Sequence, residues 1–282
     1  IGMVSINSNY AASFAANAAK QTTSELNSAM EKLSTGKRIN YARDDAAGQA
    51  IAVRLTAEIQ GLAIASRNAA DAQSLIDTAE GALQESTTLL LRMRELAVQS
   101  SNGTNTTADR AALQSEAASL EAEISRIANN TTWGGKVLLN GTFSGDEDSA
   151  GRVFQIGTTS GQRIELSIPE MTATAATIGY SVALSIGSFT GAQSAIGALD
   201  AALSGINEVR GKMGAASNRL DSTIGNLNQI RVNLMASKGR IMDTDFAAET
   251  GNLAKGQILQ QAATAMLAQA NASKQSVLVL LQ

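Results

Sequence analysis

The sequence predicts a mainly α-helical fold, in which long segments from the N- and C-terminal parts of the chain form an antiparallel helical bundle or coiled coil. Apolar residues recur at heptad spacing in both halves, and the stretch between them is rich in Gly, Thr and Ser. Only 3% of the 282 residues are aromatic. Because small side chains build thin cores, closely packed long helices suit this composition, and the middle stretch adds a small β-hairpin-rich region.

The first heptad pattern predicts one long helix. Its leading positions are Leu55, Leu62, Ala69, Ile76, Leu83, Leu90 and Ala97. Most of the residues three positions later are small. These positions are Glu58, Ala65, Ala72, Ala79, Ser86 and Met93. This alternation is typical of an a/d seam. At ~1.5 Å per residue the helix would be on the order of 65 Å long, too long for burial in a small globule.

A second helix follows the polar stretch "SSNGTNTTAD" and completes a helical hairpin. Its apolar residues are spaced by four and three, at Leu113, Ala117, Leu120, Ile124 and Ile127. We expect Thr107 or Asp109 to be its N-cap, because both side chains can accept a hydrogen bond from a backbone N–H group.

The middle of the chain, from about Lys136 to Ile186, predicts short strands joined by turns. The alternating runs are "RVFQIG", "QRIELSI" and "YSVALSI". Heptad spacing then returns, at Leu199, Ile206, Met213, Leu220, Leu227, Leu234 and Ile241. The chain is therefore expected to run out along one long helix and return along another.

Both ends of the chain carry further helical segments with large apolar side chains. An alanine-rich segment closes the sequence with "VLVLL". Such helices bury little surface alone, whereas a protein that assembles through its termini buries it between subunits. We therefore expect terminal core packing by Tyr10, Phe14, Leu26, Met30, Leu33, Ile258, Met266, Leu278 and Leu280.

The composition argues against several classes of function. The net charge is −3, without the excess of Lys and Arg that binds nucleic-acid phosphates. Cysteine and histidine are both absent, which removes thiol chemistry, disulfides, imidazole catalysis and the commonest transition-metal ligand. We expect no cofactor, no resident metal and no enzymatic activity.

Membrane insertion and a cleaved secretory signal are not expected either. The longest apolar run, "VLVLL", is far too short to span a bilayer. The first residues have neither the basic segment nor the continuous apolar segment of a secretory signal. We expect export by a route that reads no such signal.

The stretch "RDDAAGQAIAVRL" places two aspartates at the start of the first long helix. Asp44 and Asp45 are suited to accept backbone N–H bonds there and to oppose the positive end of the helix dipole. The alternative is a hard-cation or catalytic site, which would need distant carboxylates such as Asp243 and Asp245.

Three short motifs resemble functional sites but lack required residues. "DTDFAAE" lacks the next aspartate and the glycine of a calcium loop, so we interpret it as an acidic helix start. "GINEVRGK" has the wrong glycine spacing for a phosphate loop, which leaves Gly211 and Lys212 on a helix surface. "STGK" is interpreted as the end of the first helix at Gly36.

Longer motifs occur in the order found in one known family. They include "SINSNYAA", "RINYARDDAAGQAIAVRL", "RMRELAVQSSNGTN", "FQIGTTSGQ" and "GRIMDTDFAAETGNLAKGQILQQAATAMLAQAN". In these motifs, over most of residues 3–140 and 195–282, the sequence resembles bacterial flagellins.

The resemblance implies three regions. Residues 1–40 and 243–282 would be terminal helices that form the inner core of a filament. Residues 41–140 and 191–242 would be a long helical bundle domain, and residues 141–190 a short, β-rich variable region exposed outside.

The resemblance also implies a function and a set of partners. The chain would be a structural subunit that self-assembles into the extracellular flagellar filament for motility. It would pass through a type III export channel with an export chaperone, assemble beneath a filament cap protein and adjoin hook-associated junction proteins. Within this picture Asp44 and Asp45 cap the first long helix, and Arg43 forms an assembly joint with a neighbouring segment or subunit.

One face of the long hairpin is recognised in the family by a host innate-immune receptor. The matching residues are Arg92, Leu96 and Glu116, although Leu91 stands where the family usually has glutamine. The alternative is that these residues serve axial packing between subunits.

Two other functions remain open from the sequence. One is a hook–filament junction protein of the same superfamily. The other is a cell-surface relative that binds polysaccharide, for which Trp133, Phe143 and Phe154 are either stacking residues or core residues. Residues 141–190 are too few for the protease domain that some flagellins carry.

Overall fold

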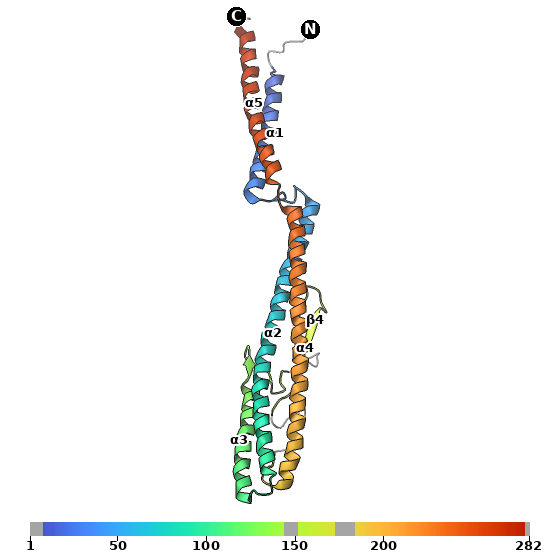
Figure 1. Ribbon diagram of the computed structural model, residues 1–282. Coiled ribbons are helices and arrows are strands. Elements are labelled where there is room, and N and C mark those ends of the chain that lie inside the picture. Colours follow the sequence, from blue (N-terminus) through green and yellow to red (C-terminus); the bar gives the residue numbers. More distant parts are fainter. Residues whose placement is uncertain (1–7, 144–151, 173–183, 280–282) are drawn as a thin grey trace. The chain divides into compact units, whose positions relative to one another are not determined.

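A computed structural model describes residues 8–143, 152–172 and 184–279, with side chains described as far as Lys274. Its helices are α1 (Tyr10–Thr35), α2 (Ala46–Ser100), α3 (Thr107–Asn130), α4 (Phe189–Met242) and α5 (Phe246–Val279) (Figure 1). In the described part of the chain, the β-structure consists of two small antiparallel hairpins. The predicted fold class, mainly helical with a small β-rich middle, is confirmed.

The chain divides into two compact units. One comprises Ile1–Ala57 and Asn233–Gln282, and the other comprises Glu58–Val232. Helices α2 and α4 each contribute residues to both units. The boundaries of these two units differ from those of the three regions that the sequence predicts. The division into three regions stays a prediction.

In the second unit, α2 and α4 pack along the predicted heptad seams. The leading positions of α2 from Leu62 to Ala97 are buried, and so are those of α4 from Leu199 to Leu220. Three polar contacts follow the same seam: Arg94 to Asp200 at 2.7 Å, Glu80 to Arg210 at 2.7 Å and Gln73 to Asp221 at 2.9 Å. As residue numbers fall in α2 they rise in α4, so the two helices are antiparallel.

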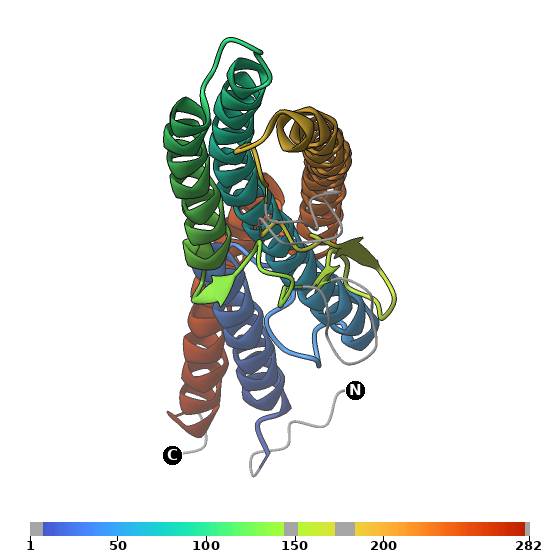
Figure 2. The same ribbon diagram turned by 90° about the horizontal axis from the view of Figure 1, so that it is seen from below.

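Helix α3 lies beside α2 and buries Ala117, Ile124 and Ala128 (Figure 2). The prediction that Thr107 or Asp109 is the N-cap of this helix is wrong. Thr106 is the N-cap, because its extended backbone brings the hydroxyl to the Asp109 N–H at 3.2 Å. The Asp109 carboxylate in turn accepts a bond from the Thr106 N–H at 2.9 Å, which completes a capping box.

Two of the three predicted runs, "RVFQIG" and "QRIELSI", contain strands, whereas the described part of the third run does not. Strands β1 (Thr132–Trp133) and β2 (Lys136–Val137) form one hairpin, and β3 (Arg152–Gln155) and β4 (Arg163–Leu166) form the other. In the predicted run "YSVALSI", residues 180–183 lie outside the described residues, and residues 184–186 form no strand. The Gln114 amide donates to the Leu184 carbonyl at 2.9 Å and accepts from the Ile186 N–H, so a side chain replaces the strand partner.

The β3–β4 hairpin is held against α2 by one hydrogen bond and one close approach. The Asn68 amide donates to the Gln155 carbonyl at 3.0 Å. At Gly61, a Cβ atom would lie 2.7 Å from the Thr158 methyl group, which is closer than a side chain tolerates. A side chain at position 61 would therefore have to displace Thr158 of the hairpin.

Candidate assembly surface on the terminal helices

Helices α1 and α5 lie side by side and antiparallel in the first unit (Figure 1). The Asn9 amide near the start of α1 donates to the Ala270 carbonyl at 3.3 Å, and Lys32 near its end pairs with Glu249 at 3.9 Å. The buried residues of α1 are small and recur every seven positions, at Ala15, Thr22 and Ala29. On α5, Gly256 is buried against Leu26. Small residues therefore let the two helices approach closely.

Local signals in the sequence explain where these helices begin and end. Asn9 caps α1 by accepting a bond from the Ala12 N–H at 3.1 Å. Gly36 ends it in a left-handed conformation, with φ of 68°, which glycine adopts without strain. Asp245 begins α5 by accepting bonds from the Ala247 and Ala248 N–H groups at 2.9 and 3.2 Å. The predicted helix end at Gly36 and acidic helix start at "DTDFAAE" are confirmed.

The large apolar residues of the terminal helices point away from the seam between α1 and α5. Phe14 is 78% exposed and Met266 is 63% exposed, and Tyr10, Met30 and Ile258 are also exposed. Leu26 and Leu33 are half-buried, while the side chains of Leu278 and Leu280 lie outside the described residues. Packing of these residues between subunits stays a prediction, because within one chain the seam is closed by smaller side chains.

An apolar groove of about 430 Å³ runs along the α1–α5 pair. Phe14 and Ala18 line it from α1, and Leu259, Ala263 and Met266 line it from α5. A groove lined almost wholly by apolar side chains is unfavourable to leave in water, so this surface is suited to cover by another apolar surface.

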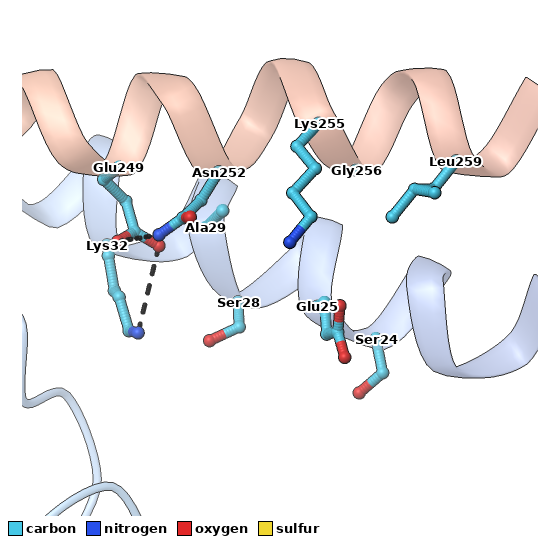
Figure 3. A pocket seen from close by; sticks show the side chains of 10 residues that line it. All are labelled: Ser24, Glu25, Ser28, Ala29, Lys32, Glu249, Asn252, Lys255, Gly256 and Leu259. Atoms are coloured by element: carbon cyan, nitrogen blue, oxygen red, sulfur yellow. Dashed lines mark hydrogen bonds and ion pairs between the residues drawn. The ribbon is translucent and has the colours of Figure 1, made fainter. Parts of the chain in front are cut away.

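A polar pocket of about 360 Å³ lies further along the same pair (Figure 3). Glu249 lies at one end of the pocket, where it pairs with Lys32 and accepts a bond from the Asn252 amide at 3.3 Å. The pocket is also lined by Ser24, Glu25, Ser28, Ala29, Lys255, Gly256 and Leu259. The two helices thus present an apolar stretch and a charged stretch along one surface.

The two linkers that join the terminal helices to α2 and α4 are hydrogen-bonded to each other. The Arg38 N–H donates to the Met242 carbonyl at 2.7 Å, and the Thr244 N–H donates to the Gly36 carbonyl at 3.1 Å. Between them, Lys37 and Asp243 form an antiparallel bridge. Asp243 therefore belongs to this backbone joint.

The adjacent aspartates have different roles in the joint. Asp45 caps α2, because its carboxylate accepts a bond from the Gly48 N–H at 2.8 Å. Asp44 does not cap that helix as predicted; its carboxylate accepts from the N–H groups of Asn40 and Tyr41 at 3.0 and 2.9 Å and closes the preceding turn. These backbone hydrogen bonds lower the pKa of both carboxyl groups.

The arginine that holds the joint is Arg38, which the sequence analysis missed. Its guanidinium donates to the Ile241 carbonyl at 2.9 Å and contacts Asp45 at 3.3 Å. Arg43 instead has a 78% exposed side chain, 3.9 Å from Asp44 and over the Tyr41 ring. The signal for Arg38 is weak in the sequence, because its main partner is a backbone carbonyl about two hundred residues away.

Ile39 and Gly48 complete the joint. Ile39 is almost fully buried, and a Cβ atom at Gly48 would lie 2.7 Å from the Ile39 side chain. A glycine inside the first turns of α2 is thus explained by the close approach of the linker.

The hard-cation alternative gains no support at this joint. Asp44 and Asp45 direct their carboxylates at backbone N–H groups, as described above. Among the residues that the structure describes, no group of three or more acidic side chains could hold a metal ion. No helix in that part of the chain is long and apolar enough to cross a membrane.

Only two of the three residues of the predicted receptor face are exposed. Arg92 contacts Glu116 at 2.8 Å and Glu95 at 3.0 Å, and all three are exposed. Leu96, however, is only 1% exposed, because it occupies the inner face of α2. Leu96 therefore lies inside the packed helices, and its part in the receptor face stays a prediction.

The aromatic residues considered for polysaccharide binding belong to the core. Phe143 is fully buried, and Trp133 and Phe154 are half-buried and packed against the core of the second unit. The Arg152 guanidinium lies over the Phe143 ring at 5.1 Å. Most of this aromatic surface is already used in packing.

Comparisons with known proteins match most of the sequence. Residues 6–144 match the bacterial flagellin N-terminal helical region, and residues 196–281 match the bacterial flagellin C-terminal helical region. A flagellin of Halalkalibacterium halodurans is 46% identical over 90% of this chain and 91% of its own length. A flagellar filament 33 kDa core protein of Treponema phagedenis is 42% identical over 98% of this chain and 99% of its own length.

A solved structure supports the fold. A putative flagellar hook-associated protein from Vibrio parahaemolyticus superimposes with a TM-score of 0.60 over 71% of this chain and 100% of its own. Its sequence identity is 18%, so the likeness concerns the arrangement of helices.

Proposed function

This chain belongs to the bacterial flagellin family, and we propose that α1 and α5 provide the surface through which its subunits bind one another. The family is structural, and the chain is a subunit of the flagellar filament. The observation that carries the proposal is the apolar groove, with Phe14 and Met266 exposed beside a seam that small residues have already closed.

The hydrophobic effect favours cover of this groove by a neighbouring subunit. Full burial of a Phe or Met side chain contributes about 1.5–3 kcal/mol. Contacts that repeat head to tail without closing a ring generate a helical filament. Tyr10, Met30 and Ile258 extend the apolar surface along both helices and add to the same contact.

The same surface explains the partners that the family implies. Before assembly, an export chaperone would cover the apolar side chains of the terminal helices during passage through the export channel. At the growing tip, a cap protein and neighbouring subunits would replace it, and hook-associated junction proteins would use the same helices at the filament base. Ordering and binding would then be coupled, because the helices gain their partners at that moment.

Arg43 is the candidate assembly contact at the joint, together with Asp44 and Asp45. Its exposed guanidinium is available to a carboxylate of a neighbouring subunit, whereas Arg38 is engaged within the chain. On the second unit, a host receptor or an axially packed subunit would meet the Arg92–Glu116 pair.

Seeded growth tests the proposal directly. Purified full-length chain is added to short filament fragments, and elongation is followed by electron microscopy. The double variant Phe14→Ser/Met266→Ser should fail to elongate while its circular dichroism spectrum keeps the helical signal of the wild type. Met235→Ser is the matched control, because Met235 is a methionine of α4 that is 54% exposed and lies outside the groove.

Two results would overturn the proposal. Growth of the double variant at the wild-type rate would remove the groove from the assembly surface. Failure of the wild-type chain to elongate seeds would count against self-assembly through any surface.

A further inference from the structure

A pocket between the β3–β4 hairpin and α4 is lined by two arginines, and we call it the arginine pocket. Its volume is about 410 Å³. Arg163 lines it from β4 and Arg219 from α4, and both side chains belong to exposed residues. Among the described residues that line the pocket, none is acidic. Neither guanidinium has an ion pair or a hydrogen bond with the rest of the described chain.

Two arginines of the α2–α4 seam show the contrast. Arg94 contacts Asp200 at 2.7 Å, and Arg210 contacts Glu80 at 2.7 Å. In the arginine pocket two guanidinium groups face one space without such a partner, so their like charges raise the free energy of the free protein. An anion placed between them would lower it, and the arginine pocket is therefore suited to bind one.

The hydroxyl groups of the arginine pocket indicate what carries the anion. Ser222 donates to the Asn218 carbonyl at 3.0 Å, and Thr223 donates to the Arg219 carbonyl at 2.8 Å. Each hydroxyl proton is thus used within α4, and the oxygen lone pairs remain for the pocket. Lone pairs accept hydrogen bonds from the hydroxyl groups of a ligand, whereas they contribute nothing to an anion.

We propose that the arginine pocket binds a sugar that carries a phosphate or sulfate monoester. The two guanidinium groups would hold the ester, because a tetrahedral oxyanion offers oxygen atoms to two planar forks at once, whereas a planar carboxylate fills one. The hydroxyl groups of the sugar would donate to Ser222 and Thr223, and its C–H surface would cover Ile156 at the edge of the pocket.

This binding activity is separate from the proposed function. All residues of the arginine pocket belong to the unit Glu58–Val232, whereas α1 and α5 belong to the other unit. The experiment below uses the full-length chain without seeds, so its result does not depend on assembly.

Calorimetric titration with glucose 6-phosphate tests the proposal. Binding should be saturable at low ionic strength and should weaken at about 150 mM salt, because exposed charges are screened over about 8 Å under that condition. Glucose 6-sulfate is the second arm, and the tighter of the two esters identifies the source of the ligand. Glucose, which lacks the anion, should not bind.

Substitution of the arginines should weaken binding most. Arg163→Gln and Arg219→Gln should each raise the Kd for glucose 6-phosphate about tenfold, because each removes one charge-assisted fork. Arg163→Lys should recover only part of the loss, since it restores the charge without the fork. Arg54→Gln is the matched control, because Arg54 is an exposed arginine of α2 outside the arginine pocket. It should bind like the wild type.

Substitution of the hydroxyl groups tests the sugar. The double variant Ser222→Ala/Thr223→Val should raise the Kd for glucose 6-phosphate about threefold and leave the Kd for inorganic phosphate unchanged. Circular dichroism should show the wild-type helical signal for every variant, because the substituted residues are exposed or half-buried.

Three results would overturn the proposal. One is the absence of saturable binding of either ester. Another is equal affinity for inorganic phosphate and glucose 6-phosphate, which would leave no role for a sugar. The third is an equal loss of binding in Arg163→Gln and Arg54→Gln, which would attribute the affinity to net charge. Each of these results would leave the proposed function intact, because that function is tested by seeded elongation.

Discussion

The α2–α4 seam and the α1–α5 pair are both antiparallel helix pairs, but they place their large apolar side chains on opposite sides. In the α2–α4 seam, Leu83, Leu90 and Leu199 are buried between the helices. In the α1–α5 pair, alanine, threonine and glycine occupy the contact, and Phe14 and Met266 face outward.

The two helix pairs also differ in whether their charged side chains have partners within the chain. Arg94 and Arg210 of the α2–α4 seam have acidic partners on the facing helix at 2.7 Å. At the α1–α5 pair, Lys32 has a partner and Lys255 has none in the described part of the chain. The first seam satisfies its own side chains within one chain, whereas the second presents side chains that a neighbouring subunit can satisfy.

The largest effect is expected from truncation of the buried seam. Leu83→Ala should lower the free energy of unfolding by about 2–5 kcal/mol, because it leaves a cavity among fully buried side chains. Urea denaturation followed by circular dichroism measures the change. Phe14→Ala provides the comparison, and it should change the free energy of unfolding by less than about 0.5 kcal/mol, because Phe14 is exposed in the monomer. A larger loss for Phe14→Ala would show that the two seams do not differ.

A smaller effect is expected from the two arginines of the joint. Arg38→Ala should lower the melting temperature of the monomer more than Arg43→Ala, because only Arg38 bonds to the Ile241 carbonyl. Arg43→Ala should instead slow filament elongation more than it lowers the melting temperature. Differential scanning calorimetry and seeded growth measure the two properties on the same preparations. An equal loss of both properties in Arg43→Ala would make that arginine an internal brace.

The smallest effect is a pH dependence at the N-cap of α2. Backbone hydrogen bonds from Gly48 lower the pKa of Asp45, so its contribution to stability is present above the unfolded pKa of about 3.9. The contribution is lost as the pH falls through the lower pKa of the folded state. The difference in melting temperature between the wild type and Asp45→Asn should therefore shrink from pH 7 to pH 3. Asp71→Asn, at an exposed position of α2, is the control. A constant difference across this range would exclude the charge of Asp45 as the cause.

Much of the helical fold could be predicted from the sequence. A heptad of Leu, Ile and Met specifies the buried face of α2 and α4, because burial of large apolar side chains dominates the free energy of packing. The helix ends at Gly36 and Asp245 followed from local backbone requirements in the same way.

The details of the candidate site could be predicted less well. In an alanine-rich helix, several faces are small enough to pack closely, so the pattern could not show that Ala15 and Thr22 are buried and Phe14 is exposed. Arg38 was missed because its partner is a distant main-chain carbonyl, which carries no side-chain signal. A motif groups Leu96 with Arg92, but the helical period places Leu96 on the buried face of α2, which the motif alone does not reveal.

Amide hydrogen exchange, measured on the monomer and on the assembled filament, tests most directly whether the α1–α5 pair is completed by a neighbouring subunit. The account predicts that protection of α1 and α5 rises strongly on assembly, while the buried seam of α2 and α4 within Glu58–Val232 is protected equally in both states. Equal protection of α1 and α5 in the monomer and in the filament would contradict it.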